Sequence, residues 1–189
     1  MGKVASFIDD IIIGTEEEEG HNEIVEEVIK RMEENNLYVK PEKCKQKVRK
    51  VGFLGVVIEN DRIKIEEEKV KVVLDWPTPK LVKDVQKFLG LANYYRQFIK
   101  DFAKIARPLH ELVRKDQKWE WEIKQEKSFE MLKKWFTMKL VLVVPDLNRK
   151  MRMEMDASYF ATGGVLSMEC EDGRWRLVAY LSKSLNETE

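Results

Sequence analysis

The sequence predicts an α+β fold arranged in three successive parts. Strand-like and helical segments alternate over residues 1–76, helical segments fill residues 77–146, and strand-like segments return over residues 147–189. Two observations mark these divisions. Pro77 and Pro79 end any helix that precedes them. Residues 151–155 alternate between methionine and charged side chains, as a half-buried strand does.

The first part begins with a predicted β-hairpin. Residues 4–8 and 11–13 are largely apolar, and the polar pair Asp9-Asp10 separates them as a tight turn. Residues 16–35 predict a helix, because apolar side chains recur at helical spacing and acidic residues precede them, where negative charge suits a helix N-terminus. The further elements predicted in this part are strands at residues 51–58 and 63–65 and a helix at residues 66–75.

The central part predicts three helices joined by short segments. Residues 81–98 carry apolar side chains on one helical face. A helix is predicted at residues 108–114 with Pro108 in its first turn, where a missing N–H is tolerated. A short strand is predicted at residues 119–121 from its alternating tryptophans. The remaining predicted elements are a helix at residues 124–137 and strands at residues 151–155, 160–168 and 175–182.

Charge is balanced overall but unevenly distributed. Lys plus Arg and Asp plus Glu both number 34, so the formal net charge is zero. Residues 80–118 hold ten basic and four acidic side chains, a local net charge of +6. A basic stretch in a neutral chain is the kind of surface that contacts phosphate. Solvated helix faces in a charge-rich protein are the alternative interpretation.

The cysteines and the apolar segments indicate an intracellular protein. Cys44 and Cys170 lie far apart, form no disulfide framework or zinc motif, and favour a reducing compartment. No apolar run approaches the ~20 residues that a membrane span needs. We expect the cytoplasm, a virus-like particle or the nucleus, with no membrane partner. Both ends of the sequence look like cuts through a larger protein.

Asp9-Asp10 is the first candidate for chemistry. Adjacent carboxylates at a hairpin tip project from a rigid support, and Mg²⁺ takes one or two carboxylates together with substrate phosphates. Two such ions can stabilise both the attacking and the leaving oxygen of phosphoryl transfer. The alternative interpretation is that aspartates simply make good turns.

Five segments, taken in order, carry a family resemblance. Residues 7–13 (Phe-Ile-Asp-Asp-Ile-Ile-Ile) resemble the [Tyr/Phe]-x-Asp-Asp motif of gypsy-type LTR retrotransposon (retroviral-like) reverse transcriptases. Residues 36–44 are similar to the family's Leu-x-x-Asn-Pro-x-Lys-Cys stretch, with Lys40 where Asn is usual, and residues 51–58 are similar to the primer grip. Residues 88–96 are similar to the thumb signature Phe-Leu-Gly-Leu-x-Asn-Tyr-Tyr-Arg. Residues 155–158 and 178–182 are similar to the first and third strands of RNase H.

The resemblance implies an internal fragment of a reverse transcriptase and RNase H polyprotein. Residues 1–76 would be the C-terminal half of the palm, with its catalytic hairpin and primer grip. Residues 77–146 would be the helical thumb bundle, and residues 147–189 the first three strands of an RNase H-like domain. The polymerase would need a third carboxylate from an upstream strand, and RNase H would need further ligands downstream. We therefore expect the parent to be an RNA-directed DNA polymerase and this chain alone to be inactive.

The resemblance also assigns site residues. Asp9, Asp10 and Asp156 would be catalytic metal ligands for Mg²⁺ or Mn²⁺ in the full-length parent. Phe53, Leu54 and Gly55 would form the primer grip and position the primer terminus. The expected partners are an RNA–DNA hybrid or DNA duplex template–primer and the remainder of the Pol polyprotein, and self-association through an unfinished sheet edge is a further expectation.

A helix over residues 84–98 would place several polar residues on one face. Gly90 would let a backbone approach closely. The resemblance implies that this face lies in the minor groove of the template–primer, and the minor groove of an A-like hybrid is wide and shallow enough to be tracked by shape. Core packing is the alternative for Tyr94. The predicted nucleic-acid-binding residues are Gln86, Lys87, Gly90, Asn93, Tyr94 and Arg96.

Three functional hypotheses follow from these residues. The first is a fragment of an RNA-directed DNA polymerase with RNase H, active in transposition and DNA integration in its full-length form. The second is a non-enzymatic duplex-binding module built around the thumb. The third is a domesticated or decayed retroelement remnant that keeps the fold without nucleic-acid work.

Overall fold

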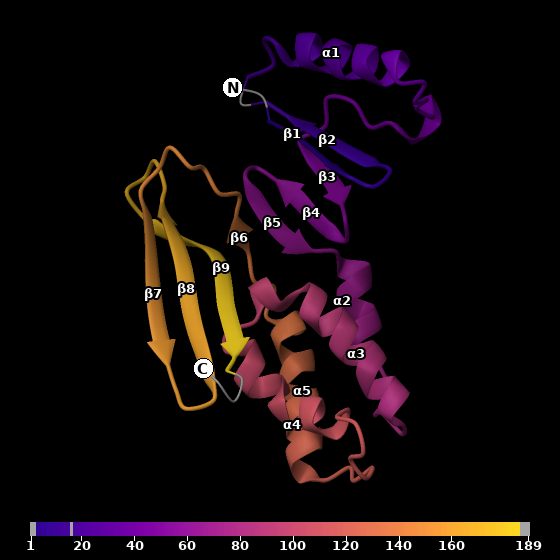
Figure 1. Cartoon of the computed structure of the whole chain (residues 1–189). Coiled ribbons are helices and arrows are strands. Elements are labelled where there is room, and N and C mark those ends of the chain that lie inside the picture. Colours follow the sequence, from indigo (N-terminus) through magenta and orange to yellow (C-terminus); the bar gives the residue numbers. More distant parts are fainter. Residues whose placement is uncertain (1–2, 16, 186–189) are drawn as a thin grey trace. The chain divides into compact units, whose positions relative to one another are not determined.

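The computed structural model describes residues 3–15 and 17–185 and divides into two compact units, Met1–Phe53 and Leu54–Glu189. Figure 1 shows the helices and strands of both units. Among the described residues, no helix combines the length and the apolar character that crossing a membrane requires.

The first unit contains the predicted hairpin. Strand β1 (Lys3–Phe7) pairs antiparallel with β2 (Asp10–Gly14), and Phe7 lies opposite Asp10. The hairpin prediction is therefore confirmed. Helix α1 (His21–Glu34) begins later than predicted, because Gly20 adopts a left-handed conformation with φ of +79° directly before it. The predicted start at Glu16 lies outside the described residues. The unit also holds a short 3₁₀ turn, η1 (Pro41–Lys43), and strand β3 (Lys50–Phe53).

The second unit begins with a small antiparallel arrangement. Strand β4 (Val56–Glu59) returns through a tight turn to β5 (Arg62–Ile65), and β5 pairs with β6 (Leu142–Val143). The predicted turn at Asn60-Asp61 is present, and both residues have positive φ, the conformation that two-residue hairpin turns require. Helix α2 (Glu67–Leu74) follows at the place that the sequence predicts.

Three helices form the main core of the second unit: α3 (Val82–Tyr94), α4 (Phe102–Leu112) and α5 (Ile123–Thr137). They lie together in Figure 1, and their apolar faces meet around Phe88, Phe129 and Tyr95, all of which are buried. The ring centroids of Phe88 and Phe129 are 4.6 Å apart. Between α3 and α4 lies a 3₁₀ turn, η2 (Arg96–Phe98), so the predicted helix over residues 81–98 divides near Tyr95.

Two predictions for the central part are wrong. Helix α4 begins at Phe102, and Pro108 lies inside it, whereas the sequence suggested a helix that starts at Pro108. Phe102, Ala106 and Leu109 are buried at helical spacing, so tertiary packing sustains the helix through the proline. Residues 119–121 form no strand; their two indole rings stack with centroids 5.9 Å apart.

The last part holds the three predicted strands, which form an antiparallel sheet in the order β7, β8, β9. Its strands are β7 (Met151–Ala157), β8 (Ala161–Glu169) and β9 (Trp175–Ser184). Trp135 of α5 contacts Tyr180 of β9 edge-to-face, with ring centroids 6.0 Å apart. The predicted boundaries at residues 76 and 146 stay a prediction. The helices, β6 and the last sheet all belong to the single compact unit Leu54–Glu189.

Candidate nucleic-acid interface and carboxylate sites

The Asp9-Asp10 pair lies at the hairpin tip, but the turn is shifted by one residue from the predicted Asp9-Asp10 turn. Ile8 and Asp9 form the turn, Asp10 is the first residue of β2, and all three are exposed. Ile8 has a φ of +52°, a strained conformation for a β-branched residue. The strained turn therefore presents two neighbouring carboxylates to solvent on a paired-strand support.

Two exposed carboxylates fit part of a magnesium site. Mg²⁺ is held through one or two carboxylates plus waters and substrate phosphates, so Asp9 and Asp10 provide suitable protein ligands. Within residues 3–15 and 17–185, no group of three or more His, Cys, Asp or Glu side chains is arranged to hold a metal ion.

Asp156 lies on strand β7 opposite Gly163 of β8. Its carboxylate accepts a hydrogen bond from the backbone N–H of Ala157 at 2.9 Å and lines a pocket of about 340 Å³. Lys100, which lies just before α4, and Lys104, in the first turn of α4, line the same pocket. Both carboxylate and ammonium groups therefore face this space from two different elements.

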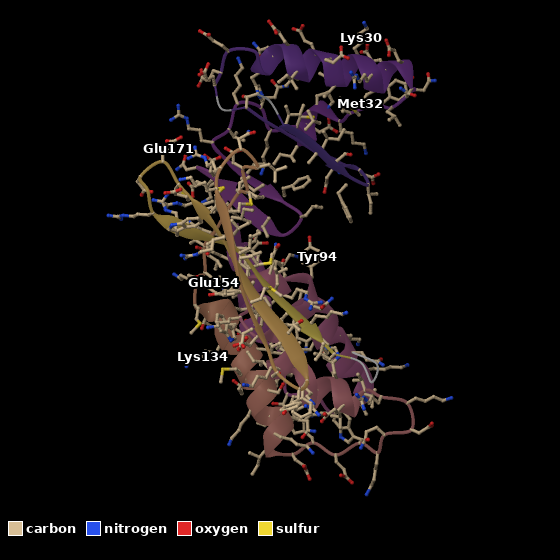
Figure 2. The ribbon with its side chains drawn as sticks, turned by 60° about the vertical axis from the view of Figure 1, so that its left-hand side comes forward. Lys30, Met32, Tyr94, Lys134, Glu154 and Glu171 are labelled. Atoms are coloured by element: carbon tan, nitrogen blue, oxygen red, sulfur yellow. The ribbon has the colours of Figure 1, made fainter. Side chains whose placement is uncertain are left out.

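The exposed face of α3 carries the predicted binding residues. Gln86, Gly90 and Asn93 are exposed, and the exposed Lys87 lies beside Gln86. A Cβ atom added to Gly90 would meet no atom within 4 Å, so no internal packing requires glycine there. Tyr94 is 55% exposed, which favours the surface interpretation over core packing, and its side chain can be followed in Figure 2.

Arg96 differs from the expected phosphate contact, because the structure engages it within the chain. Its guanidinium donates to Asn93 Oδ1 at 3.2 Å and to the backbone carbonyl of Ser182 on β9. It also lies 5.4 Å from the centre of the Phe102 ring. Arg96 therefore joins the end of α3 to the last strand while remaining exposed.

Leu54 and Gly55, two of the predicted primer-grip residues, form a turn in which both residues have positive φ. The carbonyl oxygens of this turn accept hydrogen bonds from the hydroxyls of Tyr94 and Tyr95. Phe53 ends β3 in the first unit and is half-buried. Sequence reasoning did not find the role of Tyr95, because the two partners are 40 residues apart.

Ser182 is a second residue whose contacts were missed. Its Oγ accepts a hydrogen bond of 2.9 Å from the backbone N–H of Ala103, in the first turn of α4. Such N–H groups have no partner within their own helix. The motif that contains Ser182 was visible in the sequence, but nothing in its spacing pointed to α4.

These elements together define a segment of the reverse transcriptase fold. The chain resembles the solved structure of the foamy viral protease–reverse transcriptase in complex with an RNA/DNA hybrid, with a TM-score of 0.78 and 24% identity. That match covers 98% of this chain and 25% of the other. The structure of the same viral protein in complex with dsDNA matches with the same score and identity and is covered over 39% of its length.

Sequence comparisons identify the family. The model described as reverse transcriptase (RNA-dependent DNA polymerase) matches residues 2–58, and the model described as an RNase H-like domain found in reverse transcriptase matches residues 121–189. The two matched segments and the relatives described next, which are retrotransposon Pol polyproteins, confirm the resemblance to this family. Both enzyme families depend on divalent metal ions in general.

The relatives that match the whole chain, or nearly all of it, are much longer proteins. The chain is 36% identical to the retrovirus-related Pol polyprotein from transposon opus of Drosophila melanogaster, matching all of this chain and 20% of that protein. It is 32% identical to the transposon Tf2-3 polyprotein of Schizosaccharomyces pombe, matching 98% of this chain and 14% of that protein. The chain therefore spans a fifth or less of these relatives.

Proposed function

We propose that the chain is the part of an RNA-directed DNA polymerase with RNase H that holds the RNA–DNA template–primer. In the full-length parent, Asp9 and Asp10 would serve nucleotidyl transfer, and Asp156 would serve RNA cleavage. Leu54 and Gly55, with Phe53, would position the primer terminus. The remainder of the Pol polyprotein is the expected protein partner.

The observation that carries the proposal is the exposed face of α3. Glycine inside a helix is about 1 kcal/mol less favourable than alanine, yet Gly90 has open space around it. Gln86 and Asn93 flank it on the same exposed face. A glycine that packing does not require, between polar side chains, suits close approach to the wide minor groove of an A-like hybrid.

The carboxylates suit Mg²⁺ or Mn²⁺. Asp9 and Asp10 would hold the ion at the polymerase site, and Asp156 would hold it at the RNase H site. The bound ion would supply stabilisation of the charge that develops during phosphoryl transfer. Because the described residues gather no group of three potential ligands, we expect no measurable primer extension by this chain alone with Mg²⁺. We also propose that the parent works inside the cell, in the cytoplasm, a virus-like particle or the nucleus.

Binding to an RNA–DNA hybrid at several salt concentrations tests the proposal. We expect salt-dependent affinity, since contacts between lysines and phosphates release counterions. Gly90→Glu should weaken binding at least about tenfold, because it places a charge and a side chain against the groove backbone. Gly14→Glu is the matched control, since Gly14 also has open space around its Cα and is exposed.

Two results would contradict the proposal. One is the absence of binding by the unmodified chain at low salt. The other is equal affinity of the Gly90→Glu and Gly14→Glu variants, because the α3 face would then take no part in binding. Appreciable primer extension by the chain alone would contradict the expected incompleteness of its metal site.

A further inference from the structure

The Leu54–Gly55 turn has an unusual backbone. Leu54 has a φ of +51° and Gly55 a φ of +76°. Glycine adopts this conformation readily, but leucine does so uncommonly. A turn with leucine at such a position persists when surrounding contacts determine its shape.

Two hydroxyl groups from α3 provide such contacts. Tyr94 donates to the carbonyl oxygen of Leu54 at 2.6 Å, and Tyr95 donates to that of Gly55 at 3.1 Å. The Gly55 carbonyl also accepts from the backbone N–H of Glu66 at 3.2 Å. Both carbonyls of the turn are therefore tied to the C-terminal end of one helix.

Tyr95 is a firm anchor for this contact. It is 2% exposed, and its ring meets the edge of Phe136 with centroids 5.6 Å apart. Burial, followed by the nearby Tyr94 and Glu66, raises the pKa of Tyr95 to about 12. The hydroxyl therefore keeps its proton and remains a donor at neutral pH.

The turn can lie this close to Tyr95 because Gly55 has no side chain. A Cβ atom at this position would lie 2.5 Å from Tyr95 Oη, closer than real contacts allow, and 3.6 Å from Tyr95 Cζ. The clash concerns the hydroxyl oxygen alone, since the distance to the ring carbon is an ordinary contact. This difference makes the contact testable by a pair of substitutions.

We propose that Tyr94 and Tyr95 are positioning residues that fix the Leu54–Gly55 turn to the end of α3. The helix that carries the predicted groove-binding face would then also determine where the predicted primer-contacting turn lies. A shift of α3 on the duplex would be transmitted directly to the primer terminus. The effect of α3 on the primer terminus rests on the proposed function, whereas the attachment of the turn to α3 rests on the hydrogen bonds themselves.

Hydrogen exchange on the full chain without nucleic acid tests the attachment. Tyr95→Phe keeps the ring and removes the donor, so amides of residues 54–58 should exchange about fivefold faster, the factor expected for one lost hydrogen bond. Tyr38→Phe, at an exposed tyrosine in the other unit, is the matched control and should leave these amides unchanged. Unchanged exchange in Tyr95→Phe would overturn the proposal.

A double substitution tests the contact more sharply. Gly55→Ala should accelerate exchange in the turn more than Tyr95→Phe does, because the new Cβ meets Tyr95 Oη. In the combined variant the hydroxyl is absent, so exchange should fall below that of Gly55→Ala alone. Strictly multiplicative effects of the two substitutions would show that the residues do not interact and would overturn the proposal.

The primer half of the inference is tested by binding preference. Affinity is compared for a hybrid with a recessed primer 3′ terminus and for a hybrid of equal length whose ends are closed by loops. We expect the chain to prefer the recessed terminus and Tyr95→Phe to lose that preference about fivefold, with affinity for the closed hybrid within twofold. Equal preference in both proteins, or no preference in the unmodified chain, would overturn the inference while hybrid binding upheld the proposed function. An absence of all binding would instead overturn the proposed function, and the exchange experiment would still decide whether the turn is attached.

Discussion

The helices α3, α4 and α5 differ from the N-terminal hairpin in how completely they bury apolar side chains. Phe129 of α5 has no exposed surface, and Phe88 and Tyr95 of the same core are almost as completely buried. Among the described residues of the first unit, none is buried; Phe7 is 53% exposed and Ile8 is 84% exposed. The predicted polymerase carboxylates therefore lie on a segment with little core of its own.

This difference indicates that the helical core supplies stability, whereas the hairpin carries the predicted catalytic carboxylates. Burial of apolar surface stabilises a fold by roughly 25 cal/mol per Å², so the helical core supplies most of the free energy of folding. The hairpin gains much less from its own contacts, although its strands are fully paired. Its apolar side chains Phe7 and Ile8 remain exposed.

The largest expected effect on the free energy of unfolding is found by substituting one phenylalanine in each of these two regions. Phe129→Ala removes a ring that contacts Phe88 and Trp121, and it should lower the free energy of unfolding by about 3–5 kcal/mol. Phe7→Ala removes a ring of the same size from an exposed position and should cost less than about 1 kcal/mol. Denaturant unfolding followed by far-ultraviolet circular dichroism, which reports on the backbone of both units, measures both losses. Equal losses would mean that the hairpin is as tightly packed as the helices, which would contradict the comparison.

A smaller effect is expected where α4 meets the last strand. Ser182→Ala removes the acceptor for the Ala103 N–H, so this helix start should lose about 1 kcal/mol, as a lost N-terminal cap does. Ser184→Ala changes an exposed serine two residues further along the same strand and is the matched control. The measurement is again denaturant unfolding. A loss of the same size in both variants would show that the Ser182 contact contributes nothing specific.

Local patterns were sufficient to predict the hairpin and the final sheet. Residues 3–7 pair with residues 10–14 because two apolar runs flank a short polar break, although the turn itself is Ile8-Asp9. The alternation at residues 151–155 yields β7. The same reasoning failed at Pro108, where a local rule placed a helix start. Burial of Phe102 and Ala106 at helical spacing outweighs that rule, and only the assembled core reveals it.

The candidate site was predictable in its composition but not in its internal contacts. The exposure of Gly90 and Asn93 follows from their helical spacing relative to the buried Phe88 and Leu89. The contacts of Arg96 with Ser182, 86 residues further along the chain, and of Tyr95 with Gly55 were beyond local reasoning. They join segments that the sequence keeps far apart, and a single sequence has no local signal for such pairs. Backbone conformations such as that of Leu54 depend on the same distant contacts.

The smallest expected effect is seen in the titration of Tyr95. Because burial raises its pKa from 10.0 to about 12 in the folded state, the folded protein holds this proton more tightly than the unfolded chain does. The stability that Tyr95 contributes is therefore fully present below pH 10 and is lost as pH rises toward 12. Ultraviolet absorbance of tyrosinate should show a late phase near pH 12 that Tyr95→Phe removes. Tyr38→Phe should retain that phase, because Tyr95 is intact. A late phase that persists in Tyr95→Phe would mean that the Tyr95 hydroxyl is not held in the core. Tyr95 would then not be the residue that attaches the predicted primer-contacting turn to the helical core.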